Sequence, residues 1–183
     1  MIPQASKTIL MMKLRYITLP LILLFFGLGQ SNALSAQNNT TTNIALQIKG
    51  EVLTPLNLTI KQLKEYPTHQ VDVKDKNGKS HRYTGVYVQD VLTKAGVTTG
   101  HDLKGENLTK YVLADCADGY QVLYSLAELD SSFTAHPPII AYQMDGQPLF
   151  QSKGPLRMVM PQDKKPARDC FQLKSLSVHF AKE

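Results

Sequence analysis

The sequence predicts an α+β fold with mixed, largely antiparallel sheets and a few short helices. Three observations indicate this class. Short stretches in which apolar and polar residues alternate recur along the chain, which is typical of half-buried strands. Turn pairs of the Asn-Gly and Asp-Gly type separate several of these stretches. Helical spacing of apolar residues is confined to short segments between them.

Length and composition narrow the classes of protein. A chain of 183 residues allows one domain with a substantial core, and a hydrophobic content of 43% excludes intrinsic disorder. Residues 1–33 hold three of the 20 basic residues and no acidic ones, so the rest carries 17 basic against 15 acidic residues. Because no basic stripe with interleaved aromatic residues remains, we expect no nucleic-acid partner.

The N-terminal segment predicts export. Lys7, Lys13 and Arg15 precede an uncharged apolar run at 17–29, which is shorter than the roughly 20 residues of a transmembrane helix. Ser31-Asn32-Ala33 fits the small–x–small pattern that precedes signal-peptide cleavage. We therefore predict cleavage near Ala33 and a periplasmic or secreted location, with an uncleaved membrane anchor as the alternative.

The cleavage site divides the chain into three predicted parts. Residues 1–33 are the signal peptide, and the polar residues 34–43 form a flexible lead without any apolar period. The folded domain is predicted to span residues 44–181.

The first half of the domain predicts strands around one short helix. Apolar residues alternate from Ile44 to Ile48, and Thr59 can cap a helix at 60–65 that ends before Pro67. A hairpin with an Asn77-Gly78 turn is predicted from a strand at 71–73 and its return at 80–84.

The second half predicts one more helix and a series of strands. After Gly85, four apolar residues (Val88, Val91, Leu92 and Ala95) share a helical face, and Gly96 ends the helix. Ser125 and Glu128 form a capping box for a helical turn at 126–129. Strands are predicted at 111–114, 120–124, 139–143, 156–160 and 173–180.

Cys116 and Cys170 are the two cysteines of the chain, and both lie in the predicted exported part. Oxidising compartments allow such a pair to form one disulfide, so Cys116 and Cys170 are a disulfide candidate. Cys116 is also a weak candidate for a metal ligand, and a small buried thiol is the third alternative.

Four stretches resemble one family. They are Gly50-Glu51-Val52 with Leu58–Leu63, Tyr83–Leu92, Asp118-Gly119-Tyr120, and Gly154–Pro161. In their order and spacing they are similar to the oxidoreductase molybdopterin-binding domain family, which has the sulfite oxidase-like fold. The resemblance covers about residues 44–181, and it implies a molybdopterin-binding-like domain with the Gly–x–Pro–x–Arg stretch beside the cofactor.

The departures from the family pattern bear on function. The resemblance implies a cysteine thiolate that binds molybdenum, on the strand before the aromatic–x–Gly–Val segment. Here that region is His69–Lys76 and contains no cysteine. The stretch Ser152–Pro155 replaces the usual His-Gly, and the loop after Pro161 lacks tryptophan.

Several residues are candidates for binding a ligand. Arg157, among apolar neighbours, needs an anion if it points inward, either a carboxylate of the protein or a ligand phosphate. Lys164, Lys165 and Arg168 form a basic loop that suits an anionic ligand, with a solvated loop as the alternative. Asp118 and Tyr120 flank a turn glycine. They are candidates to line the cleft, and turn geometry is the alternative.

These observations predict a small exported binding or accessory module on a molybdopterin-oxidoreductase scaffold that is not catalytic. Its expected partner is an anionic small molecule or a membrane or periplasmic protein, and no bound cofactor is expected. A molybdenum-cofactor-dependent oxidoreductase that binds molybdopterin is the first alternative, and a purely structural interaction domain is the second. The five histidines are scattered and are interpreted as surface or packing residues.

Overall fold

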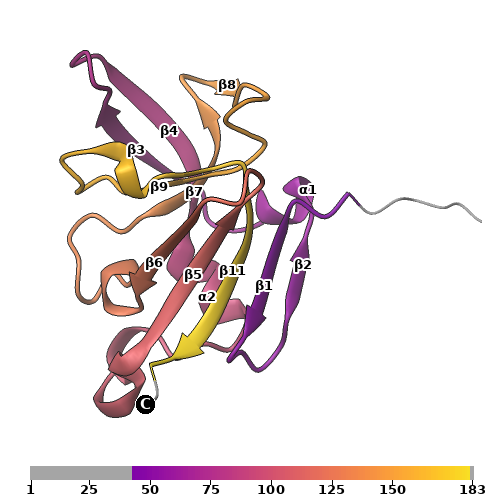
Figure 1. Cartoon of the computed structure of the whole chain (residues 1–183), viewed down its shortest axis with the longest axis vertical. Coiled ribbons are helices and arrows are strands. Elements are labelled where there is room, and N and C mark those ends of the chain that lie inside the picture. The colour runs from indigo at the N-terminus through magenta and orange to yellow at the C-terminus, as the bar shows by residue number, and fades with distance from the viewer. Residues whose placement is uncertain (1–42, 182–183) are drawn as a thin grey trace, which may run out of the picture. The chain divides into compact units, whose positions relative to one another are not determined.

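The computed structural model describes residues 43–181, so the predicted signal peptide and the cleavage site at Ala33 lie outside the described residues. A five-stranded sheet has the strand order β2-β1-β11-β5-β6, and a six-stranded sheet has the order β10-β9-β7-β4-β3 with β8 paired to β7 (Figure 1). The five-stranded sheet consists of β1 (Leu46–Gly50), β2 (Leu56–Leu58), β5 (Lys110–Cys116), β6 (Gln121–Ser125) and β11 (Leu173–Phe180). The six-stranded sheet consists of β3 (His69–Lys74), β4 (Ser80–Tyr87), β7 (Ile139–Met144), β8 (Gln147–Pro148), β9 (Arg157–Val159) and β10 (Cys170–Phe171).

The helices are short. Within residues 43–181 they are α1 (Ile60–Leu63) and α2 (Val88–Lys94), with four 3₁₀ turns at η1 (Gly100–Asp102), η2 (Gly105–Thr109), η3 (Ala127–Leu129) and η4 (Pro166–Arg168). The strands pair antiparallel except for β1 and β11, which run parallel. The predicted class, α+β with mixed, mostly antiparallel sheets and short helices, is therefore confirmed. Within the described residues, no helix has the length and apolar character that a membrane crossing requires.

Local sequence signals explain the best-predicted elements. Thr59 caps α1, because its side chain accepts from the Gln62 amide while the Gln62 side chain accepts from the Thr59 amide. Gly85 lies where β4 approaches β7, and a Cβ atom there would meet the Ile140 carbonyl oxygen at 2.2 Å. Only glycine fits this close strand approach, which accounts for the Gly-Val pair that leads into α2.

Two buried clusters lie on opposite faces of the six-stranded sheet. The main core joins the inner faces of both sheets with α2 and includes Leu46, Val91 and Met158. A smaller cluster contains Tyr83, Ile139, Ala141 and Val159, with Val73 and Met144 packed against it. Because side chains alternate along a strand, Arg157 and Val159 share the face opposite to Met158. Arg157 is thereby placed on the face of the smaller cluster.

Some boundaries and elements differ from the predictions. The predicted strand at 80–84 continues to Tyr87, the predicted helix at 60–65 ends at Leu63, and the turn at 126–129 is the 3₁₀ helix η3. The strands β2, β8 and β10 were not predicted, since two or three residues are too few to show an alternating pattern.

Candidate functional site

Arg157 is a buried cation at the start of β9. Its side chain is 6% exposed, and its Nη2 atom donates to the Oδ2 atom of Asp169, which is 2% exposed. The Nη1 atom donates to the Tyr83 hydroxyl at 2.5 Å. The other oxygen of Asp169 accepts from the Met160 amide at 3.0 Å. Arg157 thus has the protein carboxylate that the sequence analysis named as one of its two alternatives.

Two aromatic rings enclose the guanidinium. The Cζ atom of Arg157 lies 4.7 Å from the ring centroid of Tyr83 and 4.4 Å from that of Phe171. Planar guanidinium groups stack well on aromatic faces, so this arrangement fixes the side chain. Among the described residues, the buried Nε atom of Arg157 has no hydrogen-bond partner. One donor of a charged group therefore remains unused, which is costly unless water or a ligand accepts from it.

Arg157 lines a cavity of about 410 Å³, which we call the Arg157 cavity. Val73, Tyr83, Met144 and Phe171 give it apolar and aromatic walls. Its charged lining residues are Lys74, Asp75, Lys76, Lys153 and Arg157, which makes four cations and one carboxylate. Since Asp169 already faces Arg157, the positive charge that a ligand would meet comes mainly from the three lysines.

His81 joins two turns at the rim of the Arg157 cavity. Its Nδ1 atom lies 2.7 Å from Asp145 Oδ2, and its Nε2 atom lies 3.6 Å from Asp75 Oδ2. The hydrogen bond with His81, together with one from the Arg82 amide, lowers the pKa of Asp145 below its ordinary value. Because both ring nitrogens face carboxylates, His81 fastens the β3–β4 turn to the turn after β7.

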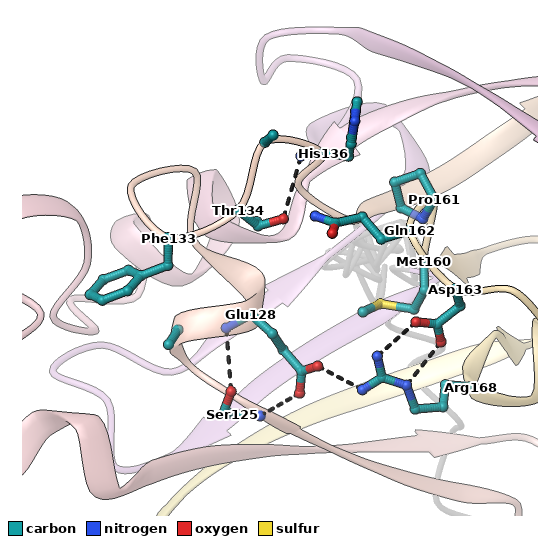
Figure 2. Close-up of a pocket in the computed structure, with 12 residues that line it drawn as sticks. Ser125, Glu128, Phe133, Thr134, His136, Met160, Pro161, Gln162, Asp163 and Arg168 are labelled. Atoms are coloured by element: carbon teal, nitrogen blue, oxygen red, sulfur yellow. Dashed lines mark hydrogen bonds and ion pairs between the residues drawn. The ribbon is translucent and has the colours of Figure 1, made fainter.

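Arg168 lies in a different hollow of about 560 Å³, which we call the Arg168 hollow (Figure 2). Figure 2 shows its guanidinium between two carboxylates: Nη1 donates to Glu128 at 2.6 Å, and Nε and Nη2 donate to Asp163 at 2.9 and 2.8 Å. These bonds raise the pKa of Arg168 above its ordinary value. With two carboxylates around one guanidinium, the charge of Arg168 is already neutralised by the protein.

The structure separates the residues that were expected to share one cleft. Arg157 and Arg168 line different cavities, and Lys164 and Lys165 are exposed on the loop before η4 and line neither of the two. The prediction of one basic cleft is therefore corrected. The physical reason is that Asp163 and Glu128 hold Arg168 on the side of η3, whereas Asp169 turns Arg157 toward β4.

Asp118 and Tyr120 line neither cavity. The Asp118 side chain accepts from the Tyr120 amide at 3.0 Å, so it shapes the β5–β6 turn. The Tyr120 hydroxyl donates to the Ala167 carbonyl at 2.7 Å, and the buried Tyr124 donates to the carbonyl of Arg168. Tyr120 therefore helps to hold η4 in place, which corrects its expected role in lining the cleft.

Cys116 and Cys170 are joined in a disulfide with a Cα–Cα distance of 6.0 Å. A sulfur atom in a disulfide is not a thiolate, so the weak candidacy of Cys116 as a metal ligand is corrected. Across residues 43–181, no group of three or more His, Cys, Asp or Glu side chains is arranged to hold a metal ion.

Several residues of the Arg157 cavity were not singled out from the sequence. They are Lys74, Lys76 and His81 from the β3–β4 hairpin, Lys153, and Phe171 from β10. A signal for part of the set exists, because Lys74, Lys76 and Lys153 lie in the two stretches where the chain departs from the family pattern. Asp169 and Phe171 carry no such signal, since their contacts with Arg157 join segments that only the fold brings together.

A family model matches most of the chain. The model of the oxidoreductase molybdopterin-binding domain family matches residues 33–164, and the chain belongs to that family. The family is described as an oxidoreductase domain that binds molybdopterin. A search of curated proteins finds no match.

The chain is also similar to a solved structure, the sulfane dehydrogenase SoxCD from Paracoccus pantotrophus. The TM-score is 0.58 and the identity is 20%, over 76% of this chain and 39% of that one. At this identity the likeness shows a shared fold, and this chain spans well under half of the other.

The Arg157 cavity fits only part of a molybdenum cofactor. Three lysines at the cavity suit an anionic group such as a phosphate. Molybdenum has no cysteine thiolate there: β3 presents Val73 and Lys74 to the cavity, and the two cysteines of the chain are joined to each other. The donor set is therefore suited to an anion and not to a thiolate-bound metal.

Proposed function

We propose that this protein is a non-catalytic binding module that holds an anionic small molecule in the Arg157 cavity. The observation that carries the proposal is the set of three lysines, Lys74, Lys76 and Lys153, around a cavity that the buried Arg157 also lines. These groups line a cavity to which β3 contributes Val73 and Lys74, and the region His69–Lys76, which corresponds to the family's cysteine-bearing strand, contains no cysteine.

Charge and shape together indicate the class of ligand. Lys74 and Lys76 approach from β3 and its turn, and Lys153 approaches from the segment before β9, so cations flank the cavity on two sides. Phosphate and carboxylate groups are the anions that such side chains bind best. The rings of Tyr83 and Phe171 with the Met144 side chain offer apolar surface to the rest of the molecule.

The side chains around the cavity are poorly suited to acid–base or nucleophilic catalysis. Both nitrogens of His81 face carboxylates. The Tyr83 hydroxyl accepts from Arg157, and burial raises the pKa of Tyr83 above its ordinary value, so it stays protonated at neutral pH. Among the lining residues there is no serine, threonine or cysteine to act as a nucleophile.

We further propose that the protein works outside the cytoplasm, in the periplasm or after secretion, once the segment up to Ala33 has been removed. The Cys116–Cys170 disulfide supports this location, because disulfides persist in oxidising compartments. A membrane or periplasmic protein that receives the bound module remains the proposed second partner. N-terminal sequencing of the exported protein tests the cleavage site, and a start before residue 30 would contradict it.

The ligand class is tested by titrating the purified protein with inorganic pyrophosphate at low ionic strength in a calorimeter. We expect binding that weakens as salt is added, because the lysines are partly solvated. The variant Lys153→Gln should lower the association constant about fivefold, since one nearby cation contributes about 1 kcal/mol. The matched control Lys61→Gln changes an exposed lysine on α1, and it should change the association constant by less than about twofold.

Two outcomes would contradict the proposal. One is the absence of any heat of binding at millimolar pyrophosphate. The other is an equal loss of affinity in Lys153→Gln and Lys61→Gln, which would place the anion on the general surface of the protein.

A second candidate function is a molybdenum-cofactor-dependent oxidoreductase. Membership of a family whose domain binds molybdopterin favours it. This function requires a ligand for the metal other than a cysteine thiolate, and the molybdenum content of the exported protein distinguishes the two functions.

A further inference from the structure

The disulfide adjoins the residues that enclose Arg157. Cys170 stands between Asp169, which pairs with the guanidinium, and Phe171, which stacks on it. All three residues belong to the short segment at β10, and within β10 Phe171 is registered opposite Arg157 of β9. A bond that fixes the position of Cys170 therefore also restrains Asp169 and Phe171, which are two of the three side chains that contact the Arg157 guanidinium.

β10 is short, and hydrogen bonds of its neighbours in the chain support it, with Gln172 accepting from the Ala117 amide at 3.0 Å and Asp169 from the Met160 amide at 3.0 Å. It consists of two residues at the edge of the six-stranded sheet and pairs only with β9, through Cys170↔Met158 and Phe171↔Arg157. Cys116, in contrast, lies at the end of β5, a seven-residue strand paired with β6 on one side and β11 on the other. The disulfide thus ties a short edge strand of one sheet to a central strand of the other.

We propose that the Cys116–Cys170 disulfide positions the anion-binding residues of the Arg157 cavity. It holds Asp169 and Phe171 in register against Arg157, so that the guanidinium and the aromatic wall are ordered before a ligand arrives. This inference rests on the proposed function for its consequence in binding. The ordering of Asp169 and Phe171 against Arg157 concerns the free protein alone.

The burial of both cysteines indicates a permanent structural disulfide rather than a redox switch. Cys116 is 5% exposed and Cys170 is 0% exposed, so reductants in solution do not reach the sulfur atoms while the protein is folded. Without the bond, β10 keeps its pairing with β9 and the hydrogen bonds of Asp169 and Gln172 beside it, but it loses its covalent link to β5. Phe171 then gains freedom that a ligand must remove on binding. A site that must be ordered on binding has a lower affinity than one ordered in advance.

The test compares the disulfide-free variant Cys116→Ala/Cys170→Ala with the variant Leu46→Ala. Leu46 is a fully buried residue of β1, which is separated from β5 by β11, so its substitution destabilises the core without touching β10. The readout is the ¹H–¹⁵N signal of the Arg157 Nε–H group in the free protein, assigned with Arg157→Lys.

In the wild-type protein we expect this signal to be shifted by the two rings and to exchange about tenfold more slowly than in the urea-unfolded protein. In the disulfide-free variant the ring shift should collapse and the exchange should approach that of the unfolded protein. In Leu46→Ala both should stay as in the wild type, although the protein is less stable. If the alanine pair does not fold, Cys116→Val/Cys170→Ala refills the buried space and takes its place.

Pyrophosphate affinity provides the second arm. The association constant should fall about fivefold in the disulfide-free variant and less than about twofold in Leu46→Ala. A folded disulfide-free variant with an unchanged Arg157 signal and unchanged affinity would overturn the inference. If the wild-type protein binds no pyrophosphate, the proposed function fails, and the Arg157 signal alone still decides the positioning role.

Discussion

Two arginines of this protein have the same charge and different surroundings. Arg157 lies between two rings with a 6% exposed side chain, pairs with one buried carboxylate and keeps one donor unused. Arg168 is 39% exposed and gives its donors to two carboxylates. The Arg157 cavity therefore has cations to spare for a ligand, whereas in the Arg168 hollow two carboxylates outnumber the one guanidinium.

The difference shows that a count of cations is a poor guide to a binding site. The loop with Lys164, Lys165 and Arg168 is the densest basic stretch after the N-terminal segment, yet its one half-buried member is used to hold η4 against η3. The lysines of the Arg157 cavity come from separate segments. What matters is which carboxylates the fold places beside each cation.

The largest effect that separates the two arginines is expected in stability. Arg157→Ala leaves Asp169 buried without its cation, and breaking a buried ion pair typically costs about 3–5 kcal/mol. Urea unfolding monitored by circular dichroism measures this loss. The double variant Arg157→Met/Asp169→Leu should recover about half of it or more, because no charge is then left unpaired. A loss below about 1 kcal/mol for the single variant would mean that the pair does not form.

A smaller effect is expected at the Arg168 hollow. Arg168→Ala removes a partly exposed ion pair network, and solvent screening limits such a loss to about 1 kcal/mol. The same unfolding experiment measures it, and pyrophosphate affinity should change by less than about twofold, since Arg168 does not line the Arg157 cavity. If Arg168→Ala lowered the pyrophosphate affinity as much as Lys153→Gln does, the proposed difference between the two sites would be wrong.

The smallest expected effect is a titration shift at the rim of the Arg157 cavity. Removing the ring of His81 in His81→Ala takes one hydrogen bond from Asp145, so the pKa of Asp145 should rise toward its ordinary value. In the wild type this pKa is lowered, so the carboxylate stabilises the fold above the ordinary pKa, and that contribution is lost as the pH falls through the lowered value.

The pH titration of carboxyl ¹³C signals measures this shift. Asp72 is the internal control, because its hydrogen bond with Arg82 holds its pKa below the ordinary value and does not involve His81. Asp145 should move in His81→Ala while Asp72 stays. Equal movement of both carboxyl groups would mean that the β3–β4 hairpin as a whole is disturbed.

The fold class was predictable because most of its signals are local. The Thr59 capping box, the Asn77-Gly78 turn and the alternation in β11 each depend on residues close together in the chain. The parallel pairing of β1 with β11 depends instead on segments more than 120 residues apart, and no local pattern indicates it. β10 is too short to show a period at all.

The candidate site was predictable only in part. That Arg157 requires an anion follows from an arginine among apolar neighbours on a strand. That this anion is Asp169, in the same segment as the supposed basic loop, depends on the tertiary packing of β10 beside β9. The lysines of the cavity stood in stretches already noted as unusual, but their convergence depends on β3 and β9 joining the same sheet, in which β4 and β7 lie between them.

The most direct test of the central claim is the molybdenum and pterin content of the purified protein. It should be purified from cells that load a related enzyme with its cofactor, and assayed for metal and for fluorescent oxidised pterin. We predict that molybdenum is far below one atom per chain, because the Arg157 cavity has no cysteine thiolate. One molybdenum and one pterin per chain would contradict the account and establish the oxidoreductase alternative.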